Sequence, residues 1–184
     1  APTWKQDNLR RDVFPFGMDS SKFVDGLLEL CEKHDACLIF RAHINVGAVD
    51  LTETDRIKSL PFGEFPDTES LLQVSDILIC DWSSLAFDYL LLNRPTLFLD
   101  VPAPFAKGFS LGKEYRFDQI VTDYPALIET LDETLGEYDH AISAGSTGRE
   151  QVSALIYETY ADGHSASRCM NRLKKHLINN ESFQ

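Results

Sequence analysis

Residues 75–100, SDILICDWSSLAFDYLLLNRPTLFLD, decide the predicted fold. The apolar run at residues 77–80 is typical of a short strand that is covered on both faces of a sheet. Residues 85–92 would form a helix with a largely apolar surface, and Pro95 cannot continue that helix. Residues 96–99 then supply a second buried strand. A strand, a helix and a strand of these lengths predict a right-handed βαβ unit in a parallel sheet.

Two adjacent hydroxyl residues, Ser83 and Ser84, stand where this helix begins. The start of a helix presents unpaired backbone N–H groups and the positive end of the helix dipole, and both attract phosphate. The alternative interpretation is an N-cap serine with a second serine beside it. The stretch carries neither a GxGxxG fingerprint nor a Walker GxxxxGK[ST] motif, so it predicts neither a dinucleotide-binding loop nor a P-loop.

The composition is that of one globular domain. A chain of 184 residues with 43% hydrophobic and 25% charged residues is long enough to bury a core. The net charge of −12 argues against non-specific nucleic-acid binding, although a phosphorylated ligand needs only a few local donors. The 4 cysteines form no CxxC pair, which indicates the reduced thiols of a cytosolic protein. No apolar run approaches the roughly 20 residues that a membrane helix needs.

Strands and helices are expected to alternate along the rest of the chain, which opens on Ala-Pro-Thr-Trp without a methionine and so resembles a piece of a longer protein. Residues 1–5 are expected to be the tail of a strand, and Gly145 to Gly148 a break before a capping box formed by Thr147 and Glu150. The remaining expected elements are a helix at 19–34, strands at 36–40 and 57–61, a helix at 68–74, a strand at 120–121 and helices at 122–135 and 165–178.

This alternation predicts an α/β fold with a Rossmann-like parallel sheet, helices on both faces, and Ile39, Ile79 and Leu97 in central strands. Parallel strands deliver their carboxyl ends to one edge. Arg41 and His43 follow one strand, and Asp81, Ser83 and Ser84 follow another, so these five residues are expected to converge on a crevice that suits a pyrophosphate.

The residues that stand out also resemble those of the CDP-glycerol glycerophosphotransferases, the teichoic-acid and capsule polymerases of bacteria. The resemblance runs in order over nearly the whole chain, and its most specific part is the block around the two serines. The matching motifs are Pro2-Thr3-Trp4, Arg41-x-His43, Ser75-Asp76-x4-Asp81-Trp82-Ser83-Ser84-x2-Phe87-Asp88, Arg94-Pro95 and Asp162-Gly163-x2-Ala166-Ser167-Arg168.

The resemblance implies the C-terminal, nucleotide-binding half of a two-domain GT-B glycosyltransferase, with residues 1–184 forming that domain. It implies CDP-glycerol as donor, transfer of glycerol phosphate to a growing polymer, and release of CMP. No Asp/Glu pair falls at metal-ligand spacing at the predicted edge of the sheet, so no metal is expected, and no cofactor is expected either. The proposed base of related enzymes lies on the other half, so no catalytic residue is assigned here. The donor-binding residues expected are Thr3, Trp4, Lys5, Arg41, His43, Asp81, Ser83, Ser84 and Asp88. Two of them have an alternative role: Asp81 would order the turn of the two serines without touching the ligand, and Asp88 would hold either the backbone of the turn or a ribose hydroxyl.

Two residues depart from the family pattern: Ile44 stands where proline is frequent, and Lys5 where arginine is usual. A lysine offers a point charge instead of a bidentate fork. These departures leave open a second hypothesis, in which the donor is a nucleotide sugar or another CDP-polyol. A third hypothesis is a non-enzymatic α/β interaction module, which predicts no saturable nucleotide binding.

The last predicted helix is basic, with Arg168, Arg172, Lys174 and Lys175. Such a run is usually a solvated face, and cations also suit a helix C-terminus. The alternative is peripheral contact with the inner face of the cell membrane by an otherwise cytoplasmic protein. The expected partners are therefore the nucleotide donor, a polyol-phosphate acceptor and, under this alternative, a membrane surface, with no nucleic acid.

Overall fold

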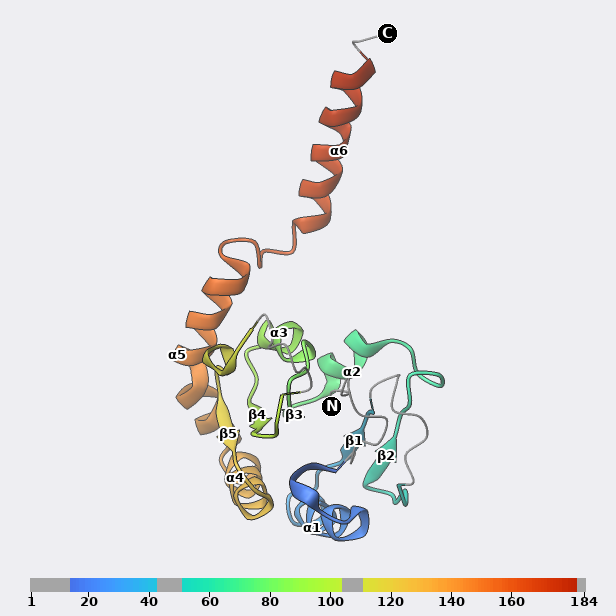
Figure 1. The fold of residues 1–184 in the computed structure, drawn as a ribbon, viewed down its shortest axis with the longest axis vertical. Coiled ribbons are helices and arrows are strands. Elements are labelled where there is room, and N and C mark those ends of the chain that lie inside the picture. The colour runs from blue at the N-terminus through green and yellow to red at the C-terminus, as the bar shows by residue number, and fades with distance from the viewer. Residues whose placement is uncertain (1–13, 43–50, 104–110, 182–184) are drawn as a thin grey trace.

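The structure is a computed structural model, and it describes residues 14–42, 51–103 and 111–181 (Figure 1). Helices and strands alternate from α2 to α4, as the sequence predicts, whereas β1 and β2 follow each other directly and three helices end the described chain. In chain order the elements are η1 (Pro15–Gly17), α1 (Ser20–Lys33), β1 (Leu38–Phe40), β2 (Ile57–Ser59), α2 (Thr68–Val74), β3 (Leu78–Cys80), α3 (Leu85–Leu90), β4 (Thr96–Leu99), η2 (Lys113–Tyr115), β5 (Gln119–Val121), α4 (Tyr124–Gly136), α5 (Tyr138–Tyr157) and α6 (Ser165–Glu181).

All strand pairs among the described residues are parallel, which confirms the predicted α/β class. They form two sheets, β1–β2 and β3–β4–β5. Leu97 lies in β4, the middle strand of the larger sheet, and pairs with Ile79 of β3. Ile39, which was also expected in a central strand, lies in the two-stranded sheet and is 36% exposed.

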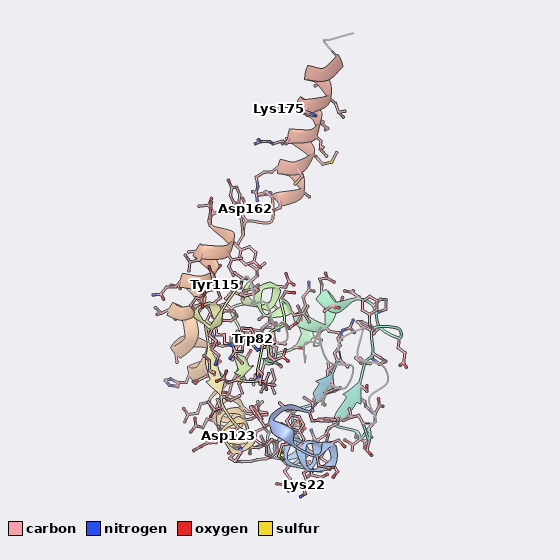
Figure 2. All side chains as sticks on the ribbon, viewed as in Figure 1. Lys22, Trp82, Tyr115, Asp123, Asp162 and Lys175 are labelled. Carbon is pink, nitrogen blue, oxygen red and sulfur yellow. The ribbon has the colours of Figure 1, made fainter. Side chains whose placement is uncertain are left out.

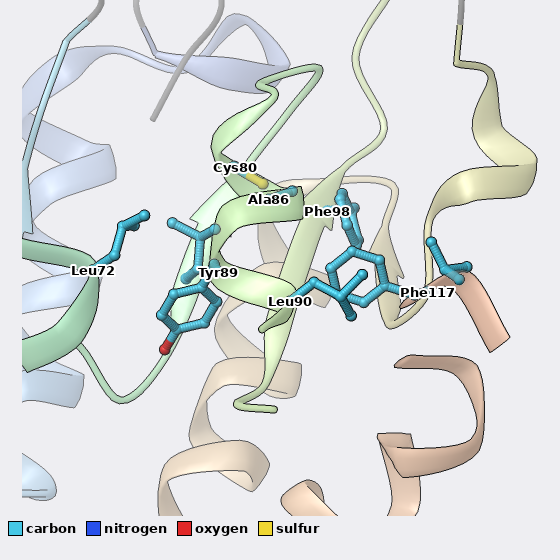
Figure 3. Close-up of a cluster of buried hydrophobic side chains, with 9 residues drawn as sticks. Leu72, Cys80, Ala86, Tyr89, Leu90, Phe98 and Phe117 are labelled. Carbon is cyan, nitrogen blue, oxygen red and sulfur yellow. The ribbon is translucent and has the colours of Figure 1, made fainter. Parts of the chain in front are cut away.

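Helices pack on both faces of the three-stranded sheet. Successive side chains of a strand point to opposite faces, and β4 shows this directly. Leu97 and Leu99 pack with α1 and α4, whereas Phe98 packs with α3, α5 and Phe117 (Figure 3). Because β4 is buried on both faces along its whole length, its sequence is an unbroken apolar run after Thr96.

Aspartates cap the helices that flank this core. The carboxylate of Asp19 accepts a hydrogen bond from the Ser21 backbone N–H at the start of α1, and Asp123 does the same for Ala126 in α4. Each satisfies a backbone donor that the helix itself leaves unpaired. From the sequence, either Asp19 or Ser20 could cap the first helix and either Thr122 or Asp123 the second, and the aspartate is the cap in both.

The predicted break at Gly145 to Gly148 is wrong, because α5 continues through it as one helix. The capping box of Thr147 and Glu150 is wrong for the same reason. A Cβ on Gly148 would lie 2.3 Å from the backbone oxygen of Phe117. This glycine therefore permits close packing of α5 against the chain before β5, and it does not end a helix.

The last helix, α6, extends away from the rest of the molecule (Figure 1). It begins at Ser165, one of the two predicted starts, and its described side chains are almost all exposed. Lys175 lies on this extended part (Figure 2). No helix among the described residues is both long and apolar enough to cross a membrane.

Candidate functional site: the turn between β3 and α3

The chain turns sharply after β3, at the residues that the sequence singles out. Asp81 is buried, with 3% of its surface exposed, and its carboxylate accepts a hydrogen bond from the Trp82 backbone N–H at 2.6 Å. A carboxylate that accepts a bond from the next residue's N–H holds the turn in place. This geometry favours the ordering role over direct contact with an anionic ligand, since like charges repel.

The two serines of the turn differ in their local roles. The Ser83 hydroxyl accepts a long hydrogen bond, 3.4 Å, from the Leu85 backbone N–H. Ser84 is the N-cap of α3 by position, but its side chain makes no capping bond and is exposed. The interpretation as a plain N-cap therefore fits Ser83 in part and does not fit Ser84.

A buried arginine, Arg116, lies over this turn. Its guanidinium carbon is 4.5 Å from the ring centroid of Trp82 and 5.8 Å from that of Phe98, and its side chain is 4% exposed. It also bonds the carboxylate of Asp100, directly after β4, at 3.3 Å. The carboxyl ends of β3 and β4 are thus connected by aromatic and ionic contacts.

Asp100 is shared between two cations. Lys113 contacts the same carboxylate oxygen at 2.5 Å. The hydrogen bond from Lys113 lowers the pKa of Asp100 most, and the nearby charges of Lys113 and Arg116 lower it further, against a smaller opposing effect of burial. Asp100 is therefore ionised at neutral pH and keeps both cations near the turn.

Arg41 follows β1 and was expected to bind the donor. Its guanidinium donates to the backbone oxygens of Leu60 and Phe65, at 3.2 and 2.7 Å, and to the Thr68 hydroxyl at 2.9 Å. It also lies over the ring of Phe62. These bonds hold the chain between β2 and α2, and no described contact joins Arg41 to the serines.

Comparison with known proteins gives the family. The family described as CDP-glycerol:poly(glycerophosphate) glycerophosphotransferase matches residues 1–175 of the chain. The chain belongs to this family. This confirms the predicted resemblance over nearly its whole length.

Relatives in this family carry teichoic-acid functions in their names. A teichoic acid glycerol-phosphate transferase of Staphylococcus aureus is 29% identical over 77% of this chain and 37% of its own length. The ribitol-phosphate polymerase TarK of the same species is 28% identical over 94% of this chain and 32% of its own length. The chain thus spans about a third of the length of these relatives.

The fold of this chain is also shared with a solved structure. The wall teichoic acid polymerase TagF matches with a TM-score of 0.69 at 21% identity, over 100% of this chain and 44% of TagF. At that identity the match is evidence for the fold alone. It agrees with the predicted α/β fold.

Four of the predicted donor-binding residues, Thr3, Trp4, Lys5 and His43, lie outside the described residues, as does the predicted strand tail at residues 1–5. Asp88 lies on α3 and is exposed. Partial burial of its carboxyl and, next in size, the charge of Glu69 raise the pKa of Asp88. No described hydrogen bond joins its carboxyl to the turn, so the expected role in holding the turn is not seen.

The buried thiol of Cys80 lies directly before the turn and is inert. Burial raises its pKa to about 12, so it is neutral at physiological pH and a poor nucleophile. Over the part of the chain that the structure describes, no group of three or more His, Cys, Asp or Glu side chains is arranged to hold a metal ion.

Sequence reasoning missed Arg116, Lys113 and Asp100. They flank a Pro- and Gly-rich stretch, of which residues 104–110 lie outside the described part, and the sequence was interpreted there only as a surface loop. One signal was available: an arginine between Tyr115 and Phe117 is a cation in an apolar setting, and such a cation needs a partner.

Proposed function

We propose that this chain is the donor-binding domain of a glycerophosphotransferase, and that residues 1–184 form one domain of a longer, two-domain enzyme. The family match over residues 1–175 carries the proposal. The chain covers about a third of the length of its relatives, and this supports separate roles for two parts of the enzyme. The catalytic base would come from the other part, so this chain alone would bind donor and transfer nothing.

In the proposed reaction, a hydroxyl of a growing polymer attacks the glycerol-linked phosphorus of CDP-glycerol. The new ester bond forms to that phosphorus, the bond to the bridging oxygen breaks, CMP leaves, and the proton of the attacking hydroxyl passes to the catalytic base on the other part of the enzyme. Ser83 and Ser84 would donate hydrogen bonds to the pyrophosphate, supported by Arg41 and His43, while Asp81 orders the turn. Thr3, Trp4, Lys5 and Asp88 complete the proposed set.

The donor hypothesis has a specific alternative. One relative is named a ribitol-phosphate polymerase, which favours another CDP-polyol as the second candidate. Calorimetry of the complete protein with CDP-glycerol, CDP-ribitol and a UDP-sugar separates the hypotheses. Tighter binding of the UDP-sugar would contradict the CDP-polyol proposals, and an absence of saturable binding with all three would favour a non-enzymatic module.

Serine-to-alanine variants test the proposed site. A hydrogen bond to a charged partner is worth about 1.5–3 kcal/mol, so we expect Ser83→Ala and Ser84→Ala each to weaken CDP-glycerol binding roughly tenfold or more. Only Ser83→Ala should also lower the melting temperature, because only Ser83 bonds the start of α3. Cytidine, which has no phosphate, should bind all variants alike.

Ser75→Ala is a matched control for these variants. The Ser75 hydroxyl bonds the Leu71 backbone oxygen at 2.7 Å, before β3 begins. Its loss should lower stability slightly and leave affinity for CDP-glycerol unchanged. Unchanged CDP-glycerol affinity in both Ser83→Ala and Ser84→Ala would contradict the proposed phosphate contact.

We also propose that a cytoplasmic enzyme of this kind touches the membrane through α6. Large apolar side chains on this helix, Met170, Leu173 and Leu177, are 53 to 62% exposed. Arg172 and Lys174 lie beside them in the sequence, a pattern typical of helices that lie in a membrane interface. Co-sedimentation with phosphatidylglycerol vesicles, compared with neutral vesicles, tests the proposed membrane contact. Removal of the same amount of protein from the supernatant by both kinds of vesicle would contradict the proposal.

A further inference from the structure

The guanidinium of Arg116 is enclosed at the carboxyl end of β4. Trp82 lies on one side of it at 4.5 Å, Phe98 is 5.8 Å away, and Asp100 accepts from it at 3.3 Å. With 4% of its side chain exposed, this cation has lost nearly all contact with water. A buried cation is costly unless its partners are well placed. The arrangement therefore implies that Arg116 does more than add charge to the surface.

Trp82 is held by more than the arginine. Its indole N–H donates to the Val101 backbone oxygen at 2.8 Å, and its backbone N–H donates to Asp81 at 2.6 Å. The indole is thus fixed at its edge by the chain after β4, while the guanidinium of Arg116 covers its face. Trp82 directly precedes Ser83, so the position of this ring sets the path of the chain into the two serines.

We propose that Arg116 is a positioning residue: by stacking on Trp82 it fixes the turn that presents Ser83 and Ser84 to the phosphates of the donor. This inference rests on the proposed function, because it needs the serines to contact phosphate. A turn that is already fixed loses little freedom when ligand binds, and affinity rises accordingly.

An arginine suits this position better than a lysine. The planar guanidinium can stack on the indole while its N–H groups reach the Asp100 carboxylate and the Leu99 backbone oxygen. A lysine ammonium keeps the charge but has no flat face and no fork. Arg116→Lys therefore removes the stacking geometry with little change in charge or size.

The test measures binding of CDP-glycerol and of cytidine to the complete protein carrying Arg116→Lys. We expect CDP-glycerol to bind about tenfold more weakly and cytidine to bind as it does to wild type. A merely structural role would not separate the two ligands. The near-ultraviolet circular dichroism of tryptophan should change as well, and Trp82→Phe identifies the band that belongs to this ring.

A double-mutant cycle with Ser83→Ala tests whether Arg116 acts through the serines. We expect Arg116→Lys to cost less affinity once Ser83 is alanine than it costs in wild type, because coupled groups are not additive; the part of the effect that acts through Ser84 remains. Arg94→Lys is the matched control. Arg94 bonds the backbone oxygens of Gln73 and Ser75 at 2.8 and 2.6 Å, before β3, so its loss should affect stability and leave both affinities unchanged.

The two proposals fail in different ways. If the serine variants bind CDP-glycerol like wild type, the proposed phosphate contact fails, and the role of Arg116 fails with it. If the serine variants lose affinity while Arg116→Lys does not, or if the two losses multiply independently, only the positioning role is overturned. Should Arg116→Lys fold poorly, Trp82→Phe supplies the second test, since it narrows the surface on which Arg116 stacks.

Discussion

The two ends of β4 each place a buried arginine beside an aspartate, and the two pairs differ in their contact with solvent. At the amino end, the side chains of Arg149 and Asp118 are 1% and 8% exposed and lie 2.5 Å apart. At the carboxyl end, Arg116 is 4% exposed but Asp100 is 26% exposed. The first pair is closed off by protein, and the second reaches the surface.

The closed pair serves the fold. Asp118 also accepts a hydrogen bond from the Thr96 backbone N–H at 3.0 Å, and Arg149 donates to Asn93 at 2.9 Å and to the backbone oxygen of Ile142. These contacts join α5 to the α3–β4 connection and to the residue before β5, which in turn bonds the first residue of β4. Open α/β sheets bind ligands at the carboxyl ends of their strands, so the open pair lies where ligand chemistry is expected.

The largest effect is expected at the closed pair. Arg149→Ala would leave the Asp118 carboxylate buried without its charged partner, and breaking such a pair costs about 3–5 kcal/mol of unfolding free energy. Urea denaturation measures this loss. Below the melting temperature, affinity for CDP-glycerol should stay near wild type, since the closed pair is assigned to stability alone.

Arg168→Ala provides the control for that measurement. Arg168 bonds Asp162 at 2.7 Å, but both side chains are more than a third exposed, at 35% and 43%. An exposed pair contributes about 0–1 kcal/mol. Equal losses of unfolding free energy in Arg149→Ala and Arg168→Ala would contradict the distinction between a buried and an exposed ion pair.

A smaller effect tests how tightly α5 packs near the amino end of β4. A Cβ on Gly148 would lie 2.3 Å from the Phe117 backbone oxygen, so Gly148→Ala must shift the helix and should cost about 1–3 kcal/mol. In Gly136→Ala the nearest atom, on His34, is 3.6 Å away, and alanine's helix propensity should add up to about 1 kcal/mol. Opposite signs in thermal denaturation are expected, and a stabilising Gly148→Ala would contradict the packing.

The same glycine shows where sequence reasoning failed. The β3–α3–β4 unit could be predicted because its signals are local: an apolar run, hydroxyls at a helix start and a proline after it. Gly148 carries the same local signal as a helix break, whereas its actual cause is contact with Phe117, which is distant in sequence. Arg149 was missed for the same reason, since its side-chain partners Asn93 and Asp118 come from two other segments.

The candidate site divides in the same way. The serines could be found because they are adjacent to each other and to a strand end. Arg116 could not be connected with Trp82 from sequence, since β4 and a loop separate them. Arg41 was predicted at the correct strand end, but its bonds to Leu60 and Phe65 depend on how the chain after β2 returns, which no local pattern specifies.

The smallest effect concerns the open pair, and it appears as a difference in pH dependence. The pKa of Asp100 is lowered in the folded state by Lys113 first and by Arg116, so its contribution to stability is present above its unfolded pKa, about 4. That contribution is lost as the pH falls through the lower folded value.

Asp88 has the opposite shift, because burial and Glu69 raise its pKa. Protonation of Asp88 therefore stabilises the fold as the pH falls through its folded value. Urea midpoints measured from about pH 3 to pH 6 should therefore fall less steeply toward acid in Asp100→Asn than in wild type, and more steeply in Asp88→Asn. Each change should stay below about 1 kcal/mol because both carboxyls reach solvent. Identical slopes in the two variants would mean that the ionic contacts of Asp100 do not distinguish this end of β4.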